Sequence, residues 1–311
     1  MYYPFLRARQ FELIALRELA AEEAIQGVII PIIEPVKETH NNLTLAHKVF
    51  QDKSQTAYLI VNPTIGELAG DSNFYLEYLT ELENAKFFPA FHYKNNSDFI
   101  NQSIESFGLN KCMIICQNDV NPDDLEFRQL VARNEVSYIN VSYPNRNRTL
   151  HRFIKGLYKN YIRLDDLFEK QARNSDYLEI QEHRFSEEHI YYAEDGFDGF
   201  SDYTVMPSEY IDGGSTPRAV VIHLTYLNGE DQIWIRHFTS ETNDSISNVQ
   251  GKFAEAAEKA VAYCRQKGLN NSAILELISY YDNEHYPGLG TVKKLSIKNH
   301  LLVVSQFLKN R

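Results

Sequence analysis

The chain has 311 residues, of which 43% are hydrophobic and 23% are charged, and its formal net charge at pH 7 is -11. This length suits one large α/β unit such as a closed barrel, which needs about 250 residues. The composition is that of an ordinary globular protein. The negative charge disfavours nonspecific binding to nucleic acid, because such binding requires a basic surface that releases counterions from phosphates. We therefore do not expect the chain as a whole to bind nucleic acid.

One segment departs from this acidic balance, since five basic residues lie close together in the sequence: Arg146, Arg148, Arg152, Lys155 and Lys159. Such a run is most often the solvated face of a helix. The net charge of the chain still leaves room for a local basic groove at this place.

The cysteine content and the apolar runs bear on the cellular compartment. Three cysteines are too few for a disulfide framework in a chain of this length, which fits a reducing compartment. The first residues show no signal-peptide pattern, and no apolar run approaches the roughly 20 residues that cross a bilayer. We expect a cytoplasmic protein without a membrane segment.

Short apolar runs alternate with stretches of helical periodicity from Gly27 onward, which is typical of βα units around a parallel sheet. Helices are predicted at residues 11–21, 43–51, 74–85, 98–107 and 123–133. Strands are predicted at residues 28–34, 57–62, 87–92, 112–117, 136–141 and 161–165. Pro31 counts against a regular strand in the first run, because proline lacks the N–H that a sheet needs. The pattern predicts a TIM-barrel-like (β/α) barrel, irregular in places.

The pattern changes after residue 169. A polar and aromatic stretch at about 170–215 reads as an irregular insertion, with a helix near 180–190 and a strand at 200–205. Two clear β runs flank Asn228-Gly229, a dipeptide typical of a tight hairpin turn, and the last part, about 247–311, is helical. We expect one barrel-like domain over residues 1–311, in which the hairpin departs from strict βα order.

Polar residues stand at the carboxyl ends of the predicted strands, where barrel enzymes place their chemistry. The candidates for acid–base catalysis or metal binding are Glu34, Lys37, His92, Asp165, Asp202 and His223. Asn62 and Arg163 are candidate ligand contacts at the same ends. The hairpin adds Arg236, which could bind a phosphate or carboxylate with His223, although a structural network of buried polar groups fits these residues equally well. Strand ends also carry polar residues simply because they meet solvent.

Familiar catalytic motifs are absent from the sequence, including GxxxxGK[ST], GxSxG, HExxH and paired CxxC. If the protein is an enzyme, a metal-assisted hydrolase of a phosphate-containing substrate is the most plausible class. A single Mg2+ or Mn2+ would then need two or three carboxylates that converge on one point. The sequence does not decide whether the protein is an enzyme.

Several segments resemble the "beta protein" group of bacterial and phage proteins. They are Tyr3-Pro-Phe-Leu-Arg-Ala-Arg-Gln-Phe-Glu-Leu-Ile-Ala-Leu-Arg-Glu-Leu19, Ile30-Pro-Ile-Ile-Glu-Pro-Val-Lys37, Val61-Asn-Pro63 and Gly199-Phe-Ser-Asp-Tyr203. The chain looks most similar to a bacterial branch that is often encoded beside a protein with a PD-(D/E)XK-type nuclease signature. The resemblance carries over no catalytic residue, but it draws attention to Arg7, Arg9 and Tyr203 as ligand contacts.

This resemblance implies a role in an anti-phage defence or toxin–antitoxin module. We expect a ligand-sensing or regulatory partner of a nuclease encoded next to it, and the acidic charge fits a chain that covers a basic partner. The metal-assisted hydrolase remains the alternative. The two hypotheses differ in whether Glu34, Asp165, Asp202 and His223 meet at one site.

Overall fold

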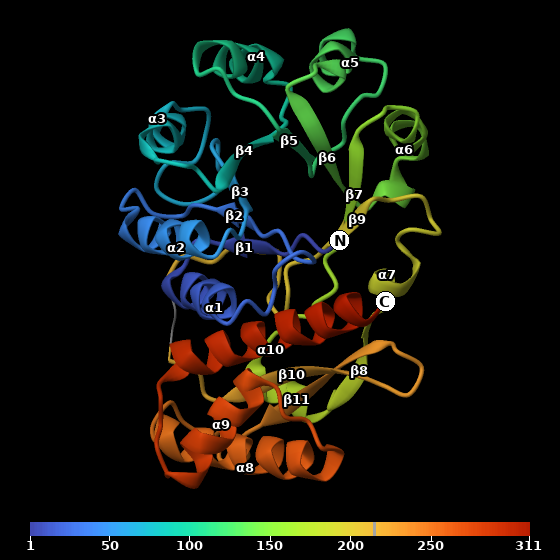
Figure 1. The fold of residues 1–311 in the computed structure, drawn as a ribbon. Helices are drawn as coiled ribbons and strands as arrows, with labels where there is room; N and C mark the ends of the chain where they lie inside the picture. The colour runs from blue at the N-terminus through green and yellow to red at the C-terminus, as the bar shows by residue number, and fades with distance from the viewer. Residues whose placement is uncertain (214–215) are drawn as a thin grey trace.

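The computed structural model describes residues 1–213 and 216–311, and its largest feature is an eight-stranded parallel sheet (Figure 1). The strands follow one another in chain order around the sheet, as βα units require. They are β1 (Phe5–Arg7), β2 (Ile32–Glu34), β3 (Ala57–Ile60), β4 (Phe87–His92), β5 (Cys112–Cys116), β6 (Val136–Ser142), β7 (Asn160–Leu164) and β9 (Gly199–Ser201).

The two edges of this sheet meet and make a TIM-like barrel. The amide of Tyr3 donates to the carbonyl of Phe200 at 2.8 Å, and the amide of Phe5 donates to the carbonyl of Asp202 at 2.8 Å. Tyr2 forms a parallel bridge to Ile29 on one side and to Phe200 on the other. The first residues of the chain therefore close the barrel against its last strand, as the predicted fold class requires.

Helices cover the outside of the barrel, one after almost every strand (Figure 1). Their apolar faces pack on the outward side chains of the strands in one continuous hydrophobic cluster. These helices are α1 (Gln10–Ala21), α2 (Asn41–Asp52), α3 (Phe74–Glu81), α4 (Ser97–Ser106), α5 (Leu125–Ala132), α6 (Arg148–Lys155) and the short α7 (Glu188–Tyr191). Single 3-10 turns, Pro144–Arg146 and Asn174–Leu178, lie in the connections.

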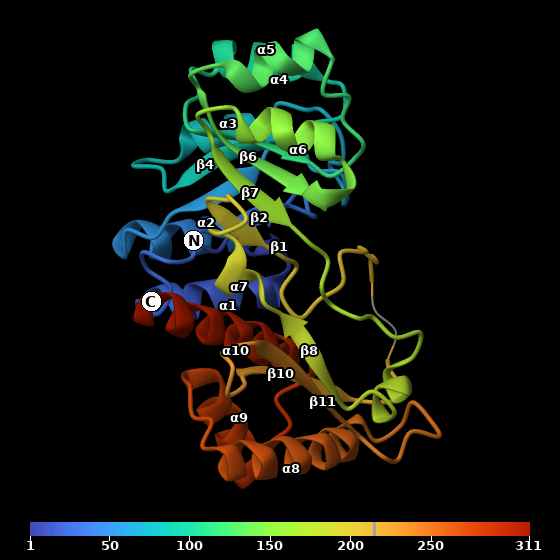
Figure 2. The same cartoon turned by 90° about the vertical axis from the view of Figure 1, so that its right-hand side faces the viewer.

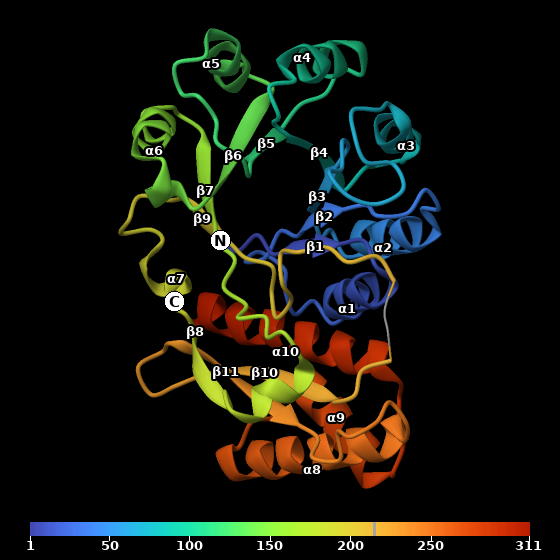
Figure 3. The same cartoon turned by 180° about the vertical axis from the view of Figure 1, so that it is seen from behind.

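A second, antiparallel sheet lies beside the barrel and consists of β8 (Glu182–Ser186), β10 (Val221–Leu227) and β11 (Ile233–Thr239), in the order β10-β11-β8. Helices α8 (Val249–Lys267) and α9 (Ser272–Asp282) cover its far side and share a hydrophobic cluster with it. The final helix, α10 (Leu289–Asn310), runs between this sheet and the barrel (Figures 2 and 3). It contacts α1 on one side and β10 on the other.

Buried ion pairs reinforce the contact between α10 and α1. Lys294 Nζ lies 2.9 Å from Glu18 Oε1, and Lys298 Nζ lies 2.6 Å from Glu22 Oε1. Both lysine side chains are more than nine-tenths buried. The last helix is thus fixed to the first by charge as well as by apolar packing.

The structure agrees with most of the predicted elements, including the hairpin and the three C-terminal helices. Three details were wrong. The three-residue strand β1 was not predicted, and residues 180–190 hold β8 followed by α7 in place of one helix. The predicted run 28–34 forms a strand only after Pro31. The last two residues of the predicted insertion, 214 and 215, lie outside the described residues. Among those described, none of the helices combines the length and apolar character of a membrane span.

Candidate functional site

Alternate side chains of the barrel strands point into its interior, and the uppermost of them form a polar mouth. The lower interior is apolar and contains Phe5, Ile32, Tyr58 and Ile60. Two residues further along each strand, the same alternation leads to polar residues at the carboxyl ends. From the strand register, these mouth residues are Arg7, Glu34, Asn62, His92, Gln117, Ser142, Asp166 and Tyr203.

The carboxylate of Glu34 is the centre of this mouth and is only 1% exposed. Its Oε1 lies 3.0 Å from His92 Nε2 and accepts hydrogen bonds from the amide and hydroxyl of Thr64, at 2.8 and 3.0 Å. Its Oε2 lies 3.2 Å from Arg7 Nη1. Burial acts to raise the pKa of Glu34, but the bonds and charges of His92 and Arg7, with the Thr64 amide, lower this pKa to about 2. The carboxylate is therefore ionised at neutral pH.

Asn62 fixes His92 in place through the backbone. Its Oδ1 accepts a hydrogen bond from the amide of His92 at 2.8 Å, and its Nδ2 donates to the carbonyl of the same residue at 2.9 Å. The Nδ2 also donates to Asp71 Oδ1 at 3.0 Å. The side chain of Asn62, two residues beyond the end of β3, thus bonds to the end of β4 and fixes His92 beside Glu34.

A covering segment, residues 204–213, lies against the mouth. Arg7 Nη2 donates to the carbonyl of Ser208 at 2.7 Å, and the amide of Ser208 donates to Asp166 Oδ2 at 3.3 Å. The guanidinium of Arg7 also lies over the ring of Tyr203, whose hydroxyl accepts from Gln117 Nε2 at 2.8 Å. The polar groups of the mouth are therefore largely paired with one another and with the covering segment.

An open pocket adjoins the mouth at the ends of β1 and β2. Its volume is about 370 Å3. Its walls are the segments that follow these two strands, the first turns of α1 and α2, and the covering segment. The lining residues are Ala8, Arg9, Gln10, Leu13, Val36, Lys37, Thr39, Asn42, Leu43, Tyr210, Asp212 and Gly213. We call it the α1–α2 pocket.

Two cations, Arg9 and Lys37, meet the N-termini of α1 and α2 at the α1–α2 pocket, together with the carboxylate of Asp212. Arg9 lies over the ring of Tyr210 and donates to the carbonyl of Ile211, while Lys37 Nζ binds Glu67 Oε1 at 2.8 Å. Within the described residues, neither helix N-cap, Arg9 or His40, makes a side-chain capping bond. The amides of the first helical turns are therefore open to another acceptor, and the helix dipoles favour a negative one.

Asp202, a sequence-predicted catalytic candidate, lies away from the mouth. It points outward from the barrel toward α10, where its Oδ1 accepts from the hydroxyl of Tyr2 at 2.5 Å and from the amide of Thr204 at 2.7 Å. His300 Nε2 lies 3.7 Å from the same oxygen. This arrangement joins the barrel to the last helix.

Arg163 and Asp165 also lie on the outward face of the barrel. Arg163 Nε donates to Asp165 Oδ2 at 2.8 Å, and Arg163 Nη1 lies 2.6 Å from Glu188 Oε2 on α7. Both residues occupy the positions of β7 and its continuation that face the helices. The interior position at this strand end belongs to Asp166, the neighbour of the predicted Asp165.

His223 and Arg236 lie in the second sheet, outside the barrel. His223 Nδ1 is 2.7 Å from His237 Nδ1, and Arg236 Nη1 is 3.3 Å from Glu182 Oε1. The proposed metal-binding set, Glu34, Asp165, Asp202 and His223, is therefore divided among separate places. Within residues 1–213 and 216–311, His, Cys, Asp and Glu form no group of three or more that could hold a metal ion.

The structure brings together Arg7, Glu34, Asn62, His92 and Tyr203 at the mouth, with Arg9 and Lys37 at the adjoining pocket. Three further residues that the sequence pattern does not indicate also contact the mouth, namely Thr64, Asp166 and Ser208. Asp166 directly follows the predicted Asp165, whereas Thr64 and Ser208 lie in loops that carry no recognisable signal.

No protein-family model, no curated protein and no solved structure gives a significant match to the chain. The barrel mouth and the α1–α2 pocket are therefore the basis on which a function can be proposed.

Proposed function

We propose that the protein is a ligand-sensing regulatory component of a bacterial anti-phage defence or toxin–antitoxin module, and that it acts in the cytoplasm on a nuclease partner. The observation that supports sensing best is the α1–α2 pocket. This pocket lies at the face where barrels bind their ligands, and the covering segment forms part of its wall.

The pocket favours a small anionic ligand. Arg9 and Lys37 supply positive charge, and the N-termini of α1 and α2 supply backbone amides with a favourable dipole. The volume of about 370 Å3 is within the range of sites for small molecules. A nucleotide or another phosphate-bearing metabolite is the ligand class that these features fit.

Binding in the pocket would act on the covering segment. Arg9 contacts both Tyr210 and Ile211 of this segment, so a ligand that takes the guanidinium competes with these contacts. Lys37 is likewise paired with Glu67, so an anionic ligand that binds Lys37 would have to replace the Glu67 carboxylate. The ligand would therefore change the position of a surface segment, which a partner protein can detect.

The nuclease partner is proposed from charge and from the sequence resemblance. A net charge of -11 suits contact with a basic protein surface, such as the one that a nuclease offers to its substrate. The alternative is a metal-assisted hydrolase with Mg2+ or Mn2+. It has less support because Glu34, Asp165, Asp202 and His223 do not meet at one site.

Calorimetric titration with inorganic phosphate and a set of nucleotides tests the ligand. We expect one of them to bind to the wild type, and Arg9→Ala or Lys37→Ala to weaken that binding at least tenfold. Lys48→Ala, an exposed change on α2 outside the pocket, is the matched control. Equal binding by the wild type and the pocket variants would refute the site.

Co-expression with the neighbouring gene tests the partner. We expect a complex that co-elutes in size-exclusion chromatography and whose nuclease activity changes when the pocket ligand is added. Separate elution at micromolar concentration would contradict the regulatory role. It would not affect the result of the ligand titration.

A further inference from the structure

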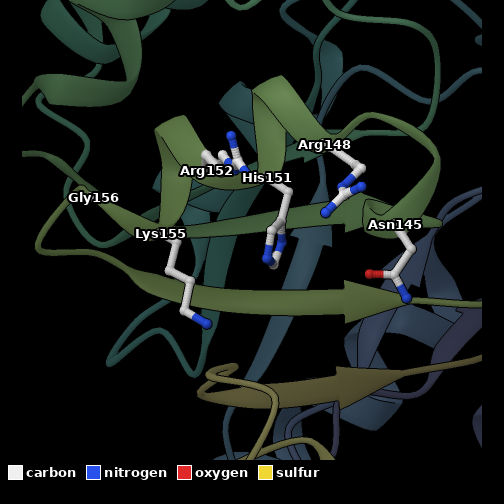
Figure 4. Close-up of a pocket in the computed structure, with 6 residues that line it drawn as sticks. All are labelled: Asn145, Arg148, His151, Arg152, Lys155 and Gly156. Atoms are coloured by element: carbon white, nitrogen blue, oxygen red, sulfur yellow. The ribbon is translucent and has the colours of Figure 1, made fainter.

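Helix α6 carries a depression on its surface that the proposed sensing function does not use (Figure 4). Its volume is about 700 Å3, and it is open to solvent. The lining residues are Asn145, Arg148, His151, Arg152, Lys155 and Gly156. Four of these residues, Arg148, His151, Arg152 and Lys155, are spaced so that they share one face of α6. We call these four residues the stripe.

The cations of this stripe are largely free of acidic partners. Within residues 1–213 and 216–311, Arg148 and Arg152 make no ion pair with a carboxylate, and both side chains are exposed. Lys155 Nζ donates only to the backbone carbonyl of Asp195, at 3.0 Å. Elsewhere on the surface, cations such as Arg128 and Arg265 are paired with aspartates. The stripe therefore brings several unpaired cations together on one helix of an acidic protein.

Three side chains of the stripe point to the same side of α6, and Arg152 points away from them. Figure 4 shows Arg148, His151 and Lys155 extending from α6 toward one side, with the amide of Asn145 beside them. The ring of His151 packs near Phe197 and lies 3.1 Å from the hydroxyl of Tyr161. Burial and the neighbouring cations lower the pKa of His151, which agrees with a positive potential at this place.

An exposed aromatic residue follows the stripe in the sequence. Tyr158 follows α6 by three residues, and its relative exposure is 105%. Exposed rings next to basic side chains are the arrangement on which unstacked bases bind, because the ring stacks on the base while the cations hold the phosphates.

We propose that the stripe on α6, together with Tyr158, binds single-stranded nucleic acid through its phosphate backbone. An open depression lined by exposed side chains suits a strand that passes along it better than a small molecule, whose sites usually enclose most of the ligand. The helix is about 12 Å long, so it can contact only a short run of phosphates. Because the contacts are with phosphates and ring faces, binding tolerates many sequences.

Fluorescence anisotropy with short labelled poly(U) and poly(dT) strands tests this proposal. If Arg148, Arg152 and Lys155 each neutralise one phosphate, affinity should fall by roughly 20-fold between about 50 and 200 mM salt. The double variant Arg148→Ala/Arg152→Ala should bind more weakly and lose only about threefold over the same range. Tyr158→Ala should weaken binding by at least about fivefold, whereas Tyr158→Leu, which keeps bulk without a π face, should not restore it.

The matched control is Arg265→Ala/Lys267→Ala at the end of α8. It changes the net charge equally, but α8 packs on the second sheet and not on the barrel. It should bind as the wild type does, and melting curves should show that all variants are folded. Binding that is equal in the α6 variant and the control would overturn the proposal. So would equal binding by free nucleotides or by a poly-glutamate peptide, because these would indicate a small-molecule pocket or a surface for acidic protein. The α6 changes lie outside the α1–α2 pocket, so this test is independent of the proposed sensing function.

Discussion

The side chains of Glu34 and His92 meet inside the barrel mouth, with Glu34 Oε1 3.0 Å from His92 Nε2. The same carboxylate faces the guanidinium of Arg7, which is only 14% exposed. Glu34→Gln removes the negative charge and leaves a largely buried cation without its partner. We expect a loss of about 3–5 kcal/mol in the free energy of unfolding, measured by urea denaturation. Glu67→Gln, on the exposed Lys37 pair, should leave that free energy nearly unchanged.

The low pKa of Glu34 also predicts how stability depends on acid. This pKa falls from 4.5 to about 2 on folding, so the contribution of the carboxylate is fully present above pH 4.5 and is lost as the pH falls toward 2. Glu34→Gln lacks this contribution at every pH. The difference in unfolding free energy between the two proteins should therefore shrink between pH 4.5 and pH 2, and a constant difference would contradict the ionised state.

The histidine pair of the second sheet predicts a separate effect at higher pH. Burial, with the nearby His183, lowers the pKa of His223 to about 3, and burial with both other histidines lowers that of His237 to about 2. The pair therefore stabilises the fold above pH 6.5, and this stability is lost as the pH falls from 6.5 toward 3. Within that range, each histidine should lower the free energy of unfolding by about 1 kcal/mol for every unit by which the pH falls. His237→Gln should reduce the slope, as measured by urea denaturation at pH 7 and pH 5.

The outward position of Asp202 predicts a structural effect for the residue that binds it. Tyr2→Phe removes a hydrogen bond to a buried carboxylate, 2.5 Å long, at the contact between the barrel and α10. We expect a loss of about 1.5–3 kcal/mol in the free energy of unfolding. Tyr158→Phe, at a fully exposed position, is the control and should show no change. An equally stable Tyr2→Phe variant would mean that this hydrogen bond contributes nothing to the contact.

Asn140 predicts a gain in stability. It lies inside the barrel between Ile115 and Ile162, is fully buried, and neither its Oδ1 nor its Nδ2 has a partner among the described residues. A buried amide without partners costs about 1–3 kcal/mol, and leucine has a similar shape. Asn140→Leu should therefore raise the free energy of unfolding by roughly that amount in chemical denaturation. An unchanged or lower free energy of unfolding would contradict this prediction.

The sequence predicted the elements whose signal is local. Helices such as α8 and α10 are long and carry clear apolar stripes, and Asn228-Gly229 marks the hairpin directly. The strand β1 has only three residues, and β8 is composed mainly of polar residues, so neither shows the apolar run that predicts a strand. Their pairing comes from distant segments, which no local pattern can indicate.

The candidate site was predicted in part, for a different reason. Strand ends could be located, but a parallel strand in a barrel is apolar on both faces, so the sequence does not reveal which alternate positions point inward. Glu34 and His92 occupy inward positions, whereas Asp165 and Asp202 are one residue out of phase and face the helices. The α1–α2 pocket depends on the covering segment, whose position comes from contacts such as that of Arg7 with Ser208.

The closure of the barrel has a consequence for biosynthesis. The first strand emerges from the ribosome well before β9, since Tyr3 and Ser201, which bond across the seam, are 198 residues apart. At about 5–20 residues per second, the nascent amino-terminal edge waits on the order of 10–40 seconds for its neighbour. During translation this exposed edge is open to mispairing with other chains, so the yield of native protein should respond to chaperone supply and to synthesis speed.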